Sequence, residues 1–332
     1  ASLTPLARDL MAAYSARIAF YAPTWTPLPV QYVDYTLWQR EVLGSEDDPT
    51  SLIAQQERYW VETLRDAPDL LPLPIDRARP SRSSLSGGAH GFEIDAELHA
   101  KMIDLAGRHR TTLFMVVHAA LAVVLSRLSG STDIAIGTAL AGRGDPALDN
   151  LVGMLVNTVA LRLRVDEDLS FAELVAAARR VDVDAFAHSE VPFETVVDAV
   201  APQRTGSVPP LFQTALAFRN ITPARVELPE ITVSELENPF EPANFDLLLT
   251  VDDDGSRKPG GDMTMMFTYS TELFDAETVE TFGRHLASVL RAGVTEPTRV
   301  VADLPLAEVV TAVTEVATTA PAAYTGPSVV AS

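Results

Sequence analysis

The stretch LVGMLVNTVALRL, from Leu151 to Leu163, places two polar residues inside an otherwise apolar run. Its second half continues as VNTVALRLRV, which is typical of a buried β-strand with Asn157 and Thr158 at its start. Gly153 lies on the approach to that strand, where the lack of a side chain lets another segment come close to the backbone. Because buried polar side chains need hydrogen-bond partners, two interpretations of Asn157 and Thr158 stay open. Either they fix a loop at the start of the strand, or they line a route to a substrate.

Two further segments predict helices. QYVDYTLWQ, from Gln31 to Gln39, puts Tyr32, Tyr35 and Trp38 on roughly one helical face, which favours aromatic anchors over a direct substrate contact. HSEVPFETVV begins at His188, and its proline and glutamate suit the first turn of a helix. This pattern makes His188 the approach to a helix rather than a catalytic base.

The segment RTGSVPPLFQ runs from Arg204 to Gln213. Its two prolines preset the backbone, and Phe212 is a candidate anchor. Arg204 and Ser207 then stand where a phosphate could be held by charge-assisted hydrogen bonds. The alternative is a rigid loop in which Arg204 pairs with a local acid.

In this order and spacing, the four segments resemble the condensation domain of nonribosomal peptide synthetases, a chloramphenicol-acetyltransferase-like family that joins two carrier-bound aminoacyl groups. The family's HHxxxDG motif is absent, and the opening ASLTPLARDL resembles the residues that follow it. Leu155 stands where the family usually has an aromatic residue, and Val208 where it often has an arginine. The resemblance implies no catalytic residue in this chain, so we expect the chain alone to be inactive. It implies these substrate-binding residues: Gly153, Asn157, Thr158, Arg204, Ser207 and Gln213.

The resemblance also implies partners. Substrates would arrive on the phosphopantetheine of upstream and downstream peptidyl carrier domains, beside an adenylation domain, with no cofactor bound directly. A second hypothesis is a condensation-like platform without chemistry, such as the domains that recruit cytochrome P450 enzymes in glycopeptide pathways. The two hypotheses differ in the motif expected before Ala1, HHxxxDG for the enzyme and HRxxxDD for the platform. The VNT and PLFQ motifs favour the enzyme.

Composition excludes several other classes. The formal charge is −20, from 45 acidic and 25 basic residues, which argues against nucleic acid and against an anionic membrane surface as partners. The chain has no cysteine, so thiolate nucleophiles and disulfides are excluded, and this composition fits a cytoplasmic protein. No pair among the 6 histidines has the spacing of zinc ligands, and no metal site is expected.

Residues 66–88, rich in proline and then in serine and glycine, predict an extended connector. We therefore predict three parts: residues 1–80 as the C-terminal end of an N-terminal condensation lobe, residues 81–305 as the C-terminal lobe, and residues 306–332 as a linker or disordered tail. The expected class is an α/β sandwich of the chloramphenicol acetyltransferase type, plus the terminal helices of an incomplete N-terminal lobe. Periodicity predicts helices over 3–20, 33–42, 53–64, 96–109, 111–128, 171–186, 192–200 and 275–292, and strands over 90–95, 133–140, 156–165, 212–220, 231–236, 245–251 and 263–269.

Overall fold

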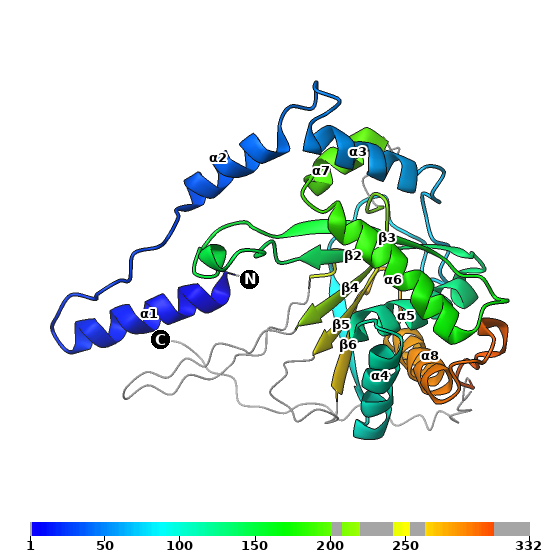
Figure 1. The fold of residues 1–332 in the computed structure, drawn as a ribbon. Helices are drawn as coiled ribbons and strands as arrows, with labels where there is room; N and C mark the ends of the chain where they lie inside the picture. The colour runs from blue at the N-terminus through cyan, green and yellow to red at the C-terminus, as the bar shows by residue number, and fades with distance from the viewer. Residues whose placement is uncertain (1, 201–207, 220–241, 253–262, 309–332) are drawn as a thin grey trace, which may run out of the picture.

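A computed structural model describes residues 2–200, 208–219, 242–252 and 263–308 (Figure 1). The strand predicted over 231–236 and most of the predicted tail lie outside these residues. So do two predicted site residues, Arg204 and Ser207.

One mixed sheet organises the described part of the chain. Its six strands lie in the order β1-β6-β5-β4-β2-β3, with β4 parallel to both β2 and β5 and the remaining pairs antiparallel. Their bounds are Gly87–Ile94 (β1), Asp133–Leu140 (β2), Asn157–Arg164 (β3), Thr214–Arg219 (β4), Leu247–Asp252 (β5) and Met263–Ser270 (β6). The predicted strands are thus confirmed wherever the structure describes them.

The strand predicted over residues 212–220 begins at Thr214, two residues after its predicted start. Leu211 has a φ of 68°, and the backbone N–H of Phe212 bonds to the carbonyl of Pro210 at 2.9 Å. This tight turn keeps Phe212 and Gln213 out of the ladder, so the strand starts at Thr214. Their side chains are buried beneath it instead.

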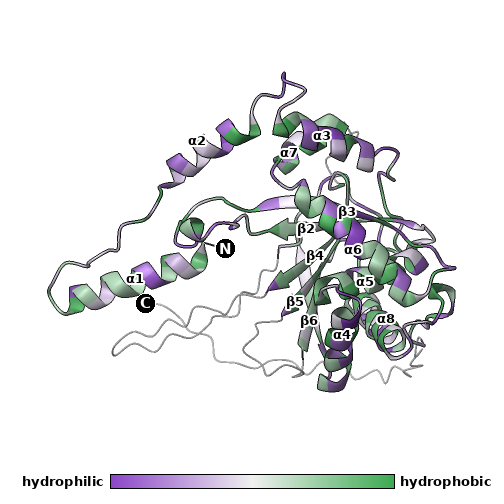
Figure 2. Ribbon diagram, viewed as in Figure 1, coloured by the Kyte–Doolittle hydropathy of each residue, from purple (hydrophilic) through white to green (hydrophobic). Residues whose placement is uncertain are grey.

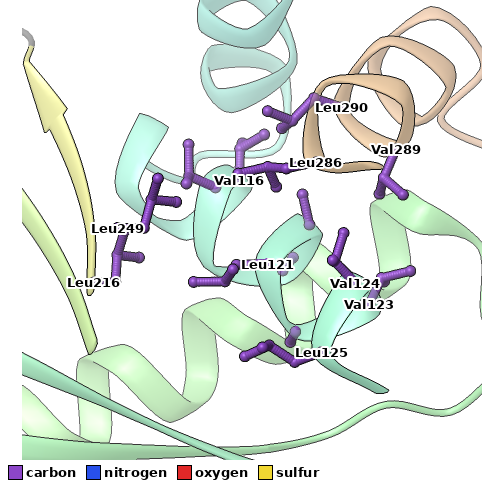
Figure 3. Packing of buried hydrophobic residues seen from close by; sticks show 14 of the residues in the cluster. Val116, Leu121, Val123, Val124, Leu125, Leu216, Leu249, Leu286, Val289 and Leu290 are labelled. Atoms are coloured by element: carbon purple, nitrogen blue, oxygen red, sulfur yellow. The ribbon is translucent and has the colours of Figure 1, made fainter. Parts of the chain in front are cut away.

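Four helices cover one face of the sheet (Figure 1). They are α4 (Ala96–Arg108), α5 (Leu113–Ser129), α6 (Phe171–Ala187) and α8 (Ala276–Thr295). Helix α5 is buried continuously from Met115 to Ser126 and lies at the centre of the main core, as Figure 3 shows. The apolar run in the sequence is therefore the middle of a core, in which α5 packs against both α6 and α8.

Helix starts follow the expected capping chemistry. Thr112, the N-cap of α5, accepts a hydrogen bond from the backbone N–H of Met115 at 3.3 Å. At the other end, Gly130 adopts a left-handed conformation with φ 70°, which ends the helix. Ser170 and Glu173 form a capping box on α6.

Helices α3 (Leu52–Thr63) and α7 (Phe193–Val200) pack together beside β3. Trp60 on α3 is only 2% exposed, and its indole N–H donates to the carbonyl oxygen of His188 at 2.8 Å. Although α3 precedes the connector in sequence, it therefore shares a hydrophobic core with the sheet.

Helices α1 (Leu3–Ile18) and α2 (Tyr32–Leu43) form an arm that extends away from the sheet (Figure 1). Hydrophobic residues run along this arm, as the colouring of Figure 2 shows. Leu6 and Leu10 are 51% and 64% exposed, so the first helix carries uncovered apolar side chains. Tyr14, on the same helix, is half-buried.

Two oppositely chargeable side chains meet inside the helical layer. His118 on α5 and Asp182 on α6 are both fully buried, with Nδ1 and Oδ1 2.8 Å apart. Removing one member of a buried pair strands the other, whereas replacing both with apolar residues is often neutral. The pair therefore links α5 to α6 through a buried polar contact whose net contribution to stability is expected to be small.

We expect Asp182→Ala to lower the free energy of unfolding by about 3–5 kcal/mol. The double variant His118→Leu/Asp182→Leu should recover most of that loss, because no polar group is then stranded. Urea denaturation of the two variants measures both values. A double variant as unstable as the single one would contradict this interpretation.

The uncovered arm should make the isolated chain self-associate, since contiguous apolar patches of a few hundred Å² promote association. Leu6→Glu/Leu10→Glu should shift the chain toward monomer in light scattering. Val183→Glu, at an apolar residue of α6 that is 45% exposed, serves as the control and should change nothing. A monodisperse monomer from the unaltered chain would refute the expectation.

Candidate functional site

The loop between β2 and β3, residues 141–156, joins the arm to the sheet. Gly142 has a φ of 63°, and a side chain there would overlap the carbonyl oxygen of Leu155, so only glycine fits this turn. Leu148, Leu151 and Leu155 form a small buried cluster, against which Tyr32 and Tyr35 of α2 pack. The predicted anchoring role is thus confirmed for Tyr32 and Tyr35. It is wrong for Trp38, whose side chain is 56% exposed.

Gly153 is the point of closest approach in this loop. A Cβ there would lie 2.5 Å from the ring of Tyr32, which confirms that the glycine admits a neighbouring segment. Ser2, at the start of α1, donates its hydroxyl to the Gly153 carbonyl at 2.8 Å and accepts from the Gly153 N–H at 3.2 Å. Tyr32 also donates to the carbonyl of Met154 at 2.9 Å. Both helices of the arm are therefore bonded to one short stretch.

Asn157 uses its whole amide within the protein. Its Nδ2 donates to the carbonyl oxygens of Ser189 and Val191, both at 2.7 Å. Its Oδ1 accepts from the backbone N–H groups of Thr158 at 2.9 Å and Phe193 at 3.1 Å. These contacts support the loop-fixing interpretation that the sequence left open beside the substrate route.

The side-chain amide of Gln56 binds the same loop, residues 188–193. Gln56 on α3 is 3% exposed, and its Oε1 accepts from the backbone N–H groups of Glu190 at 2.9 Å and Val191 at 3.0 Å. His188 stacks on Tyr59 with ring centroids 3.8 Å apart, a packing contact that agrees with its predicted structural role. Sequence reasoning missed Gln56, because a glutamine on an amphipathic helix gives no signal of its partner.

Gln213 is also committed to structure. It is 3% exposed, its Oε1 accepts from the Leu71 N–H at 2.9 Å, and its Nε2 donates to the carbonyls of Asp69 at 3.1 Å and Pro209 at 3.0 Å. These hydrogen bonds attach the proline-rich connector to the residue that precedes β4. The half-buried Thr158 hydroxyl, by contrast, has no hydrogen bond to any residue that the structure describes.

Arg162 on β3 pairs with an acidic side chain and also binds the end of α3. Its Nε and Nη2 donate to the two carboxylate oxygens of Asp133 at 2.8 and 2.6 Å, and its Nη1 donates to the carbonyls of Thr63 and Arg65 at 2.8 and 2.7 Å. Hydrogen bonding to Asp133 raises the pKa of the Arg162 guanidinium above its ordinary value. A cation thus sits at the C-terminal end of α3, where the helix dipole favours it.

An ion pair that the sequence did not reveal lines a hollow near the PLFQ segment. Arg79 in the connector makes a two-pronged contact with Asp246, including Nη1 to Oδ1 at 2.8 Å. The hollow beside it measures about 430 Å³, and its wall includes Pro209 and Pro210. Arg204 and Ser207 precede Pro209 in the sequence and are outside the described residues.

Within the described ranges, no group of three or more His, Asp or Glu side chains could hold a metal ion. No single described helix is both long and apolar enough to cross a membrane; α4 and α5 pass that test only as a pair bent by 107°.

The fold and these motifs together define a condensation-type α/β domain. The family model of the condensation domain matches residues 1–311, and the chain belongs to that family. Among curated relatives, it is 43% identical over 307 residues to a dimodular nonribosomal peptide synthase of Bacillus subtilis (strain 168). It is 40% identical over 306 residues to an isonitrile lipopeptide synthase of Mycobacterium tuberculosis. These alignments cover 92% and 91% of the chain but only 13% and 12% of the relatives.

Solved structures confirm the α/β fold class. The X-domain from teicoplanin biosynthesis matches with a TM-score of 0.84 and 30% identity, over 92% of this chain and 69% of that one. A four-domain nonribosomal peptide synthetase, AB3403, matches with a TM-score of 0.79 and 24% identity, over 93% of this chain and 24% of that one.

We expect Asn157→Ala to lower the free energy of unfolding by about 2–3 kcal/mol, because it leaves backbone groups of the 188–193 loop unpaired. Thr158→Val is the control and should cost less than about 1 kcal/mol, since its hydroxyl has no described partner. Thermal and urea denaturation measure both. An Asn157→Ala variant as stable as the control would return Asn157 to the substrate-route interpretation.

Proposed function

We propose that this chain forms the C-terminal lobe, and the last helices of the N-terminal lobe, of a nonribosomal peptide synthetase condensation domain. The reaction is amide formation between aminoacyl or peptidyl groups held as thioesters on carrier proteins. The observation that carries the proposal is membership of the condensation family over residues 1–311, with the VNT and PLFQ motifs present.

The catalytic HHxxxDG motif is proposed to precede Ala1. Ser2 is bonded to Gly153, so residues before Ala1 would reach the molecule at the β2–β3 loop. That contact supports a reaction centre beside this loop. A histidine there would act as a base on the attacking amine, a contribution of roughly 10²–10⁴-fold.

The residues of this chain would contribute orientation. Joining two tethered substrates in a fixed geometry can supply on the order of 7–11 kcal/mol of the barrier in favourable cases. Gly153, Asn157 and Gln213 serve this role through the backbone segments that they position, and Thr158 has a hydroxyl left for a ligand. The assignment of Arg204 and Ser207 to a pantetheine phosphate rests on the family resemblance alone.

The proposed partners follow from the same reaction. Two peptidyl carrier domains would present their substrates on phosphopantetheine, an adenylation domain would stand next in the polypeptide, and no cofactor would bind directly. A location in the cytoplasm is proposed with them.

One observation favours a second candidate function, recruitment of a partner enzyme without chemistry. The teicoplanin X-domain matches with a higher TM-score than the four-domain synthetase, and a structure of that X-domain with OxyB also matches at 0.84. The motif before Ala1 separates the candidates, HHxxxDG for condensation and HRxxxDD for recruitment.

The test uses the protein that contains this chain together with its N-terminal lobe, mixed with two charged carrier proteins. We expect an amide product by mass spectrometry, and none from residues 1–332 alone. Product from residues 1–332 alone would overturn the proposed upstream position of the catalytic motif. Absence of product from the complete domain, with tight binding of a cytochrome P450 in calorimetry, would instead establish the recruiting platform.

A further inference from the structure

Arg143 has an unusual environment for a charged residue in a protein with a formal charge of −20. It is half-buried in the β2–β3 loop, and no carboxylate of the described residues lies within ion-pair distance of it. Its guanidinium binds neutral oxygens instead. Nη1 donates to the carbonyl of Leu148, and Nη2 donates to the carbonyl of Leu151 at 2.8 Å.

These two carbonyls belong to the irregular segment that follows the short 3₁₀ helix Pro146–Leu148. The Leu148 carbonyl also accepts from the backbone N–H of Leu151 at 3.1 Å, so Arg143 adds a second donor to a turn that is already formed. The flat guanidinium presents donors at a fixed spacing, so it can hold two carbonyls in one relative position, which a lysine ammonium cannot. Arg143 therefore sets the path of the loop up to the leucine cluster on which α2 packs.

The same guanidinium extends to the arm. Nη2 also lies 3.4 Å from the hydroxyl of Ser2, the residue that holds Gly153 by two hydrogen bonds. One side chain thus contacts the loop before β3 and the first residue of the described chain. In the proposed function, these are the two segments that border the reaction centre.

We propose that Arg143 is a positioning residue for the condensation reaction. It holds the β2–β3 loop and the start of α1 in one relative geometry, so that the segment before Ala1 meets the substrates in the reactive arrangement. This inference rests on the proposed function. Because small displacements at a reaction centre slow the chemical step, its loss should reduce kcat and leave carrier binding intact.

The experiment compares Arg143→Ala, Arg143→Lys and Arg164→Ala in the complete condensation domain. Arg164 is the matched control, since its side chain is 79% exposed on the neighbouring strand. We expect Arg143→Ala to lower kcat by about 10- to 100-fold, with the KM for both carriers within about twofold of the unaltered protein. Arg143→Lys should remain impaired, and Arg164→Ala should be unchanged. Added guanidinium ion, at concentrations that do not denature, should restore part of the Arg143→Ala activity, whereas methylammonium should not.

Full activity in Arg143→Ala, or a parallel fall of kcat and Tm without rescue by guanidinium, would overturn the inference. If the alanine variant does not fold, Arg143→Lys decides: a normal kcat rejects the positioning role, and a reduced kcat at normal Tm supports it. An unaltered domain that forms no amide would count against the proposed function and would be recognised before any variant is made.

Discussion

The structure depends on a single constraint: backbone groups that leave water must still be paired, even in a loop that no helix or sheet can satisfy. The clearest case is the loop 188–193, which passes between α3 and β3. The side-chain amide of Asn157 donates to two carbonyl oxygens of this loop. The side-chain oxygen of Gln56 accepts from two of its backbone N–H groups. Trp60 adds a third contact at His188. These side chains fix the loop between α6 and α7, and the shared hydrophobic core then packs α3 and α7 beside β3.

Side chains also pair the backbone groups of two other irregular segments beside the sheet. Arg162 holds the end of α3, and Gln213 holds the connector. The arm is attached differently, through one loop that is itself held by Arg143 and through the aromatic contacts of α2. The segments before residue 80 therefore differ in how they contact the sheet. Helix α3 shares a core with β3, and Leu43 at the end of α2 is buried in that same core, whereas the start of α1 and the start of α2 are held by the β2–β3 loop.

The periodicity of apolar residues predicted those helices and strands whose burial follows from their own sequence. The apolar run of α5, the alternation of β2 and the inward face of α8 each bury their own side chains, so their periodicity identified them. Partners distant in the sequence could not be read in this way. Nothing near Asn157 indicates that its amide bonds to Ser189, and nothing near His118 indicates Asp182. The start of β4 at Thr214 was not predicted, because a turn in which leucine adopts a positive φ has no sequence signature.

The order of the strands also has a consequence for how the protein is made. β1 pairs along its length with β6, so Gly87 lies opposite Ser270. During synthesis, the ribosome must complete nearly the whole lobe before β1 finds its neighbour. Such distant pairings slow folding and leave a strand edge uncovered for longer, where it can pair with another nascent chain. The glycines and the histidine at the start of β1 lower its tendency to do so, because they form strands less readily than β-branched residues. The topology therefore favours slow folding, and the uncovered edge of β1 is a site where nascent chains can associate before β6 emerges.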